Sequence, residues 1–119
     1  MNKKNILEER SFAFALRIIK LNQYLKNDHK EYILSKQIMR SGTAIGALLS
    51  EAKYAQSKAD YLNKQSIALK EASETKYWLS LLRESNYINN KMFNSLYPEI
   101  SEIIKMLVSS TKTIKKTLS

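Results

Sequence analysis

The sequence predicts an all-α fold, and three observations support this prediction. The 119 residues include only two glycines and one proline, too little turn chemistry for an all-β or α/β fold. Apolar residues recur every three or four positions in four long stretches, which is the spacing of amphipathic helices. Short polar segments separate these stretches. We therefore expect a single domain over residues 1–119, folded as an antiparallel up-down-up-down four-helix bundle. The alternative is an extended hairpin that completes its core in an oligomer.

The first two helices are expected over about residues 8–26 and 32–56. The apolar stripe of the first consists of Phe14, Ile18, Leu21 and Leu25. The polar segment at residues 27–30 then interrupts the pattern. The stripe of the second helix follows a strict four-three spacing and consists of Leu34, Ile38, Ser41, Ile45, Leu48, Ala52 and Ala55.

The third helix is expected over about residues 58–85, because Ser57 followed by Asp60 has the S-x-x-D form of a capping box. The fourth helix is expected over about residues 91–116. Pro98 lies inside it and removes one backbone donor, which predicts a kink or a broken first turn. We also expect fraying at the C-terminal end of this helix.

Both glycines lie in the second predicted helix, four residues apart in the segment RSGTAIGALLSE. Glycine in a helix interior costs about 1 kcal/mol relative to alanine, so the pair indicates close packing against another helix. If the second and third helices form a hairpin about Ser57, Gly42 lies level with Ala72 and Gly46 lies level with Ala68. The sequence therefore predicts a close contact between these two helices, made by small residues.

The same register places Arg40 level with Glu74, with Glu71 one helical turn away. An arginine inside the bundle needs a carboxylate partner, because an isolated buried charge is very unfavourable. We therefore predict an ion pair from Arg40 to Glu74 or Glu71. A catalytic or metal-binding role for these carboxylates is the alternative, but di-metal bundles use Glu-x-x-His pairs and this chain contains one histidine.

The sequence contains no motif for enzyme chemistry. The chain has no cysteine, which excludes a disulfide framework, a thiolate metal site and a cysteine nucleophile. Glycine-rich phosphate loops, zinc-ligand spacings and nucleophile motifs are missing, and His29 lies in a polar link where a solvated residue is expected. No apolar run approaches about 20 residues, and no signal peptide is recognisable. We expect a non-enzymatic cytoplasmic protein without a metal, a cofactor or a membrane partner.

The charge of the chain is strongly basic, since 20 basic and 11 acidic residues give a formal net charge of +9. Residues 1–30 carry a net +4 and residues 91–119 a net +3, so most of the excess lies at the ends. Such a field favours nucleic acid first and an anionic membrane surface second; a lysine-rich solubilising surface is the alternative. The candidate nucleic-acid ligands lie on the first and fourth helices, which are neighbours in the predicted bundle: Arg10, Arg17, Lys20, Lys105, Lys112, Lys115 and Lys116.

The aromatic residues, seven tyrosines and one tryptophan among them, are a second possible contact for bases. Tyr77 and Trp78, however, occur in the third predicted helix. Its periodicity favours core or subunit contacts for both residues.

Two segments resemble the small four-helix-bundle proteins encoded in intervening sequences of bacterial 23S ribosomal RNA genes: RSGTAIGALLSEA and DYLNKQSIALKEASETKYWLSLL. Leu48 departs from the family pattern, which often has asparagine there. The matching positions are Arg40, Ser41, Gly42, Thr43, Ile45, Gly46, Ala47, Glu51, Ala52, Asp60, Tyr61, Lys70, Glu71, Ala72, Glu74, Thr75, Tyr77, Trp78 and Leu79.

The resemblance implies a four-helix bundle that assembles as a ring-like homopentamer. The same family includes the accessory variability determinant of diversity-generating retroelements, a basic pentamer that binds a reverse transcriptase and its RNA or DNA. By this resemblance the expected partners are other copies of the chain, RNA or DNA, and a reverse transcriptase or another protein.

Charge and resemblance together lead to the hypothesis of a homo-oligomeric accessory factor that binds nucleic acid. Its binding is expected to be independent of sequence and to weaken steeply with salt. A protein-interaction scaffold with a helical or enzymatic partner is the alternative, because a basic surface also steers an acidic protein. An amphipathic membrane-surface protein is a weaker third reading, since the apolar stripes are needed for the core.

Overall fold

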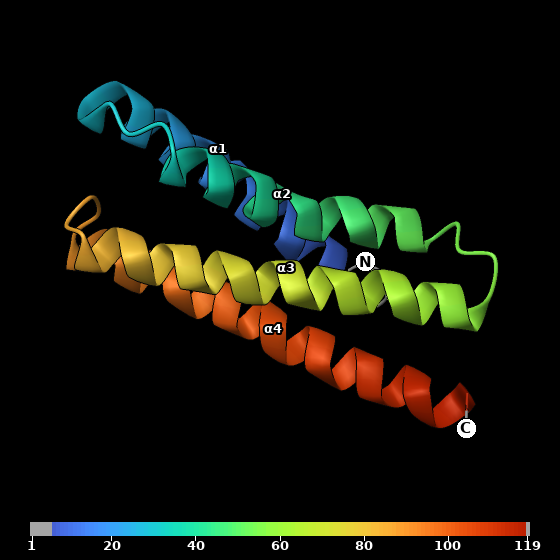
Figure 1. Cartoon of the computed structure of the whole chain (residues 1–119). Coiled ribbons are helices and arrows are strands. Elements are labelled where there is room, and N and C mark those ends of the chain that lie inside the picture. The colour runs from blue at the N-terminus through green and yellow to red at the C-terminus, as the bar shows by residue number, and fades with distance from the viewer. Residues whose placement is uncertain (1–5, 119) are drawn as a thin grey trace.

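Four α-helices make up the protein in a computed structural model, which describes residues 6–118 (Figure 1). They are α1 (Ile6–His29), α2 (Leu34–Ala52), α3 (Lys58–Glu84) and α4 (Asn90–Leu118). The described residues contain no strand. The predicted all-α class and the four helices are therefore confirmed. Within the same residues, none of the helices is long and apolar enough to cross a membrane.

α2 ends at Ala52, four residues before its predicted end, and the reason lies in the start of α3. The predicted cap is present, since the Asp60 amide donates to Oγ of Ser57 at 3.1 Å. The side chain of Asp60 in turn accepts a hydrogen bond from the Gln56 amide, also at 3.1 Å. The amide of Gln56 therefore belongs to the N-terminal cap of α3, and the chain between the helices turns with i→i−3 bonds.

Two non-glycine residues in the described part of the chain have a left-handed backbone, and each follows a helix. Lys30 (φ 51°) follows α1 and Asn86 (φ 68°) lies just after α3. The amides of Asn86 and Tyr87 donate back to the carbonyls of Arg83 and Leu82 at 3.0 and 2.9 Å, which is a Schellman motif. α1 runs three residues beyond its predicted end before the chain turns.

The start of α2 is capped by a residue that the sequence pattern did not single out. The buried carboxylate of Glu31 accepts hydrogen bonds from the amides of Ile33, Leu34 and Ser35, at 3.2, 3.0 and 2.7 Å. A carboxylate in this position satisfies three otherwise unpaired donors and interacts favourably with the helix dipole. Glu31 therefore fixes where α2 begins.

α4 is continuous through Pro98 and extends to Leu118. The expected break in its first turn is therefore not seen, and the segment expected to fray is helical as far as Leu118, with Ser119 outside the described residues. Thr111 is buried, and Ser110 donates to the side-chain oxygen of Gln65 on α3 at 2.6 Å. These contacts hold α4 against the bundle as far as Thr111.

Each helix packs against the next one along the chain, and α1 also packs against α4 in the least extensive of the four contacts. In the α2–α3 pair, Glu51 near the end of α2 contacts Lys64 near the start of α3, and Arg40 contacts Glu74 further along. The four helices thus enclose one core in an elongated body of 48 × 27 × 21 Å.

The core is filled by the apolar faces of all four helices. In α2, Leu49 is buried, whereas Leu48, which was predicted in the stripe, is only partly buried. The rotation of α2 about its axis, which spacing alone does not determine, accounts for this difference. The buried apolar residues include Phe14, Ile18, Leu21, Leu25, Ile38, Ile45, Leu49, Ala68, Ala72, Leu79, Leu82, Phe93, Leu96, Ile100, Ile103 and Leu107.

The two glycines of α2 face α1 and not α3, so the predicted contact between glycines and alanines is wrong. A methyl group on Gly42 would lie 2.9 Å from Cγ1 of Ile18, which is closer than a real contact allows. A methyl group on Gly46 would lie 3.7 Å from the backbone of Ser11, which is an ordinary contact. The glycines therefore allow close approach of α1. At Gly42 there is no room for a side chain, whereas at Gly46 a methyl group would fit.

Ala72 and Ala68, the expected partners of Gly42 and Gly46, are fully buried on α3. Beside Gly42, Ser41 of α2 reaches across to α3, and its Oγ lies 2.8 Å from Oγ1 of Thr75. Both of these polar residues are buried. A hairpin register indicates which residues lie at the same height, but not how each helix is rotated.

Candidate nucleic-acid interface

The predicted ion pair on the α2–α3 surface is confirmed. Arg40 Nη1 lies 3.1 Å from a carboxylate oxygen of Glu71, and Nη2 contacts Glu74. The indole Nε1 of Trp78 also donates to Glu74, at 3.0 Å. The side chain of Arg40 is 50% exposed, however, so the expectation of an arginine inside the bundle is wrong. Its long side chain reaches along the surface of the α2–α3 contact, where water still reaches the charge.

The residues of this cluster fit a structural role, which is to hold α2 against α3. One guanidinium bridges two carboxylates on successive turns of α3, which fixes the axial position of α2 against α3. Among residues 6–118, no three His, Cys, Asp or Glu side chains are arranged to hold a metal ion. Glu51, which belongs to the same sequence motif, lies 3.4 Å from Lys64 nearer the end of the helix pair.

The two arginines of α1 that were predicted to bind nucleic acid are engaged with α4. Arg17 contacts the carboxylate of Glu99 and donates to Ser95, to Oγ at 2.5 Å and to the carbonyl at 3.2 Å. Arg10 lies 3.8 Å from Glu102. Both arginines therefore join α1 to α4, and their charges are largely compensated within the chain.

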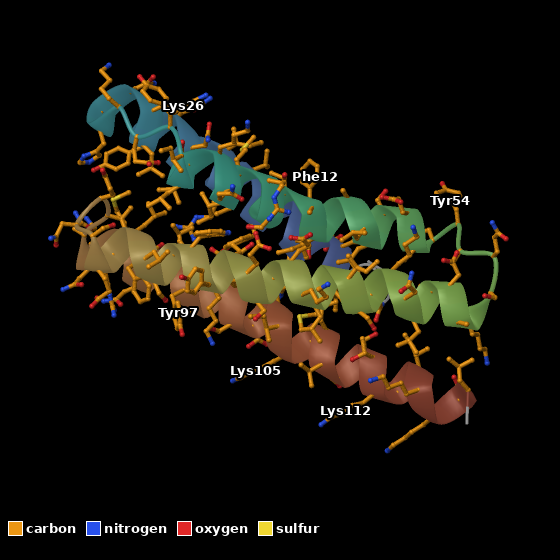
Figure 2. All side chains as sticks on the ribbon, viewed as in Figure 1. Phe12, Lys26, Tyr54, Tyr97, Lys105 and Lys112 are labelled. Carbon is orange, nitrogen blue, oxygen red and sulfur yellow. The ribbon has the colours of Figure 1, made fainter. Side chains whose placement is uncertain are left out.

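The five lysines among the predicted ligands are all exposed. Figure 2 shows Lys105 and Lys112 extending from α4 away from the other helices. Within the described residues, no carboxylate lies within ion-pair distance of Lys20, Lys105, Lys112 or Lys115. Lys116 is also exposed, one turn beyond Lys112. The C-terminal half of α4 therefore carries a positive surface on which Lys105, Lys112 and Lys115 have no ion-pair partner among the described residues.

The predicted ligands do not form one continuous patch. Lys20 lies at the other end of the α1–α4 contact, beside a cleft of about 520 Å³ between the two helices. Lys20 lies level with Lys91 and Ser95 of α4, which are about 21 and 15 Å from Lys105 along the helix axis. The two ion pairs of Arg10 and Arg17 lie between these regions.

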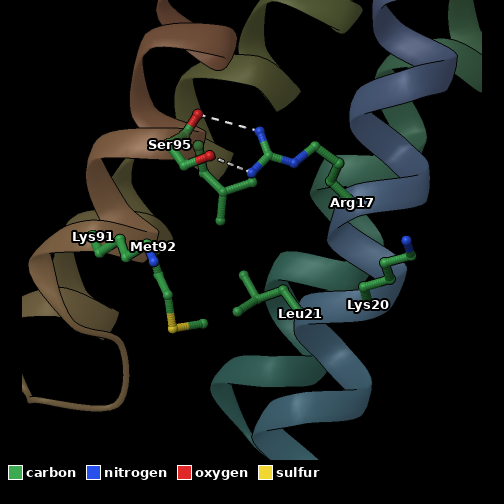
Figure 3. A pocket seen from close by; sticks show the side chains of 7 residues that line it. Arg17, Lys20, Leu21, Lys91, Met92 and Ser95 are labelled. Carbon is green, nitrogen blue, oxygen red and sulfur yellow. Dashed lines mark hydrogen bonds between the residues drawn. The ribbon is translucent and has the colours of Figure 1, made fainter.

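The cleft between α1 and α4 has an apolar floor and a cationic rim (Figure 3). Leu21 and Met92 point towards each other across it, and Arg17 spans it to reach Ser95. Its full lining is Arg17, Lys20, Leu21, Lys91, Met92, Ser95 and Leu96. No carboxylate is part of this lining.

Lys91 was not among the predicted ligands. It is exposed and contributes the charge on the α4 side of the cleft. The available signal was its spacing, because Lys91, Lys105 and Lys112 are separated by multiples of seven residues and so lie on nearly the same face of α4. The proline at position 98 occupies the missing member of this series.

Among the aromatic residues, Phe12, Tyr32, Tyr54, Tyr61 and Tyr77 are exposed, whereas the two rings of α4 are covered. Phe93 and Tyr97 stack on each other with centroids 4.7 Å apart, and their outer faces carry Arg83 and Lys76 at 4.1 and 5.0 Å. Tyr77 is exposed and contacts the half-buried Trp78 edge to face. Core or subunit contacts were predicted for both residues. Within this chain, Trp78 packs against the core, whereas Tyr77 does not.

His29 is an exposed residue at the end of α1, and not in a loop as expected. Its Nε2 lies 3.0 Å from the hydroxyl of Tyr24. The rings of Tyr24 and Tyr87 lie edge-on to it, with centroids at 5.1 and 5.6 Å. The histidine thus packs between two tyrosines at the end of the bundle.

Comparison with known proteins agrees with this fold. The family model of the 23S rRNA-intervening sequence protein matches residues 3–109. A solved structure from Bacteroides thetaiotaomicron, described as a protein of unknown function from the S23 ribosomal protein family, is 48% identical with a TM-score of 0.89. The match covers 90% of this chain and 99% of that one. The curated proteins gave no match.

The family match includes all the residues of the α2–α3 motif and of the α1–α4 cleft, and it ends before Lys112 on α4. The match to the solved structure likewise extends over nearly the whole bundle. The chain therefore belongs to the family of 23S rRNA-intervening sequence proteins.

Proposed function

We propose that this protein is a non-enzymatic accessory factor that binds RNA or DNA through α4. We further propose that it acts as an up-down-up-down bundle within a ring-like homo-oligomer, for which the family resemblance favours a pentamer. The observation that carries the proposal is a set of three exposed lysines on the C-terminal half of α4, Lys105, Lys112 and Lys115, which have no carboxylate within ion-pair distance among residues 6–118. The proposed role requires a cytoplasmic protein.

The lysines of α4 have a spacing and a chemistry that suit contacts with the phosphate backbone of a nucleic acid. Lys105 and Lys112 are seven residues apart, which places them about 10 Å apart along one helix face. Lysine acts as a mobile point charge that suits phosphate without demanding one geometry. Because Phe93 and Tyr97, the two aromatic residues of α4, are already covered, base stacking on α4 contributes little, and binding there should depend on the nucleic-acid backbone and not on its sequence.

The outer side of α1 supports the homo-oligomer. Phe12 and Leu16 are 66% and 50% exposed, on the side of α1 that the core does not use. With Ile19, Gly46 and Ala47 they line a groove of about 580 Å³ between α1 and α2. A helix with apolar residues on both faces is expected to be covered on both, and several copies in one assembly would multiply the positive field of α4.

The test measures assembly and binding on the same sample. Light scattering after gel filtration gives the mass of the particle, and fluorescence anisotropy measures its affinity for a labelled single-stranded RNA and a duplex DNA over a range of salt. The proposal expects an oligomer that binds both and loses affinity steeply between about 50 and 200 mM salt. A folded oligomer that binds neither at low salt would overturn the nucleic-acid role, and a monomer would overturn the ring.

A protein-interaction scaffold is the second candidate, and the α1–α4 cleft is the observation that favours it. This cleft combines an apolar floor with cations, which is the composition of a protein-docking site as much as of a phosphate site. A pull-down with and without nuclease treatment separates the two functions. Partners that survive complete nuclease digestion, a reverse transcriptase or another enzyme among them, would favour the scaffold.

A further inference from the structure

We infer that the cleft between α1 and α4 is a docking site for an acidic amphipathic helix of a partner protein. This inference goes beyond the nucleic-acid role, because it assigns the cleft and the exposed lysines of the C-terminal half of α4 to two different partners. The occupant would place aliphatic side chains on the floor of the cleft and carboxylates beside the lysines at its rim.

The floor of the cleft selects aliphatic groups. Leu21 and Leu96 are almost fully buried, and the flexible side chain of Met92, which is half-buried, lines the cleft beside them. Methionine adapts its shape to different apolar partners. No aromatic ring lines the cleft, so a nucleobase would find no stacking platform there.

The rim of the cleft selects negative charge. Lys20 stands on the α1 side and Lys91 on the α4 side, and neither has a carboxylate within ion-pair distance among the described residues. Arg17 closes one end and is held there by Ser95 and Glu99. Two unpaired cations on opposite walls match carboxylates on the two flanks of an amphipathic helix.

The shape of the cleft favours a helix over a small molecule. Small-ligand sites usually enclose most of the ligand surface. Here Lys20, Lys91 and Ser95 are all exposed, so the cleft is open to solvent on one side (Figure 3). The bundle would therefore cover only one face of a bound molecule. A helix laid along the seam needs cover on one face only, with its apolar anchors spaced three and four residues apart.

The methionines of the chain provide a direct test. The protein is labelled with ¹³C at the methionine methyl groups, and its NMR spectrum is followed during titration with a synthetic peptide of about 18 residues that has leucines on one helical face and glutamates on both flanks. We expect the Met92 methyl signal to shift saturably. Met39, on α2, should not shift, and it reports whether the fold is intact.

Two double variants and a scrambled peptide test whether the binding is specific to the cleft. Lys20→Glu combined with Lys91→Glu should weaken peptide binding by about tenfold or more. Lys36→Glu combined with Lys70→Glu, which changes two exposed lysines on α2 and α3, should leave it nearly unchanged. A peptide of the same composition in scrambled order should bind far more weakly.

Three outcomes would overturn the inference. Equal binding of the scrambled peptide would reduce the site to nonspecific charge attraction. A single-stranded RNA that shifts Met92 and displaces the peptide would make the cleft a nucleic-acid site. An unchanged Met92 signal at about 1 mM peptide, in a protein with an intact Met39 signal, would show that the cleft does not bind such a helix.

Discussion

The α2–α3 seam and the α1–α4 seam are both crossed by surface arginines, yet the helices contact each other far more extensively in the first. Arg40 bridges Glu71 and Glu74 in one seam, much as Arg17 bridges Ser95 and Glu99 in the other. The α2–α3 seam also contains a hydrogen bond between two buried hydroxyl groups and two fully buried alanines. The α1–α4 seam has the smaller contact and contains the cleft.

This difference teaches that ion pairs do not decide how tightly two helices of this bundle pack. Half-exposed ion pairs contribute little to stability, because water screens them. Small buried residues and paired hydroxyl groups allow close approach, and the sequence motif of the family lies on α2 and α3, where they occur. The α1–α4 seam, without them, keeps its lysines and its cleft available to partners.

The largest expected effect comes from the small residue that holds α1 against α2. Gly42→Ala should lower the free energy of unfolding by about 1 to 3 kcal/mol, because the methyl group would overlap with the stiff, branched side chain of Ile18. Gly46→Ala is the matched control and should stabilise the protein by about 0.5 to 1 kcal/mol through helix propensity. Urea unfolding measures both, and equal effects would contradict the packing described for these glycines.

The buried hydroxyl pair between Ser41 and Thr75 in the α2–α3 seam should have the next largest effect. Thr75→Val keeps the shape of the side chain but leaves Oγ of Ser41 without its partner, at a cost of about 1 to 2 kcal/mol. Thr113→Val on the exposed surface of α4 is the control and should change stability little. If both variants unfold at the same urea concentration, the hydroxyl pair does not stabilise this seam.

The ion pairs of the two seams should have the smallest effects on stability. Arg40→Gln and Arg17→Gln are each expected to cost about 0.2 to 1 kcal/mol, and the cost should shrink in high salt. Thermal unfolding at low and high ionic strength compares them directly. A loss well above this range for Arg40 alone would mean that its ion pair, and not the small buried residues, holds the α2–α3 seam together.

The sequence predicts those features of the fold that depend on spacing along the chain. The four helices follow from periodicity, and the Arg40 ion pair follows from equal distances to the turn at Ser57. The rotation of α2 does not follow from spacing, which is why the glycines face Ile18 on α1 and not the alanines of α3.

The same limit applies to the candidate site. The exposed lysines of α4 were predictable from charge and position. The compensation of Arg17 was not, because its partners Ser95 and Glu99 lie about 80 residues away in the sequence and meet it only once the bundle has formed. The cleft itself arises from the incomplete packing of two helices that are not consecutive.

The proposed function is tested most directly by removing the same number of lysines from two surfaces and measuring RNA affinity against salt. Lys105→Gln with Lys112→Gln on α4 is compared with Lys36→Gln with Lys70→Gln on α2 and α3, all four residues being exposed. We predict weaker binding for the α4 variant only, with a log–log salt slope flatter by about 1.4 for each subunit that contacts the strand. Equal loss in both variants, or no loss in either, would contradict the assignment of nucleic-acid binding to α4.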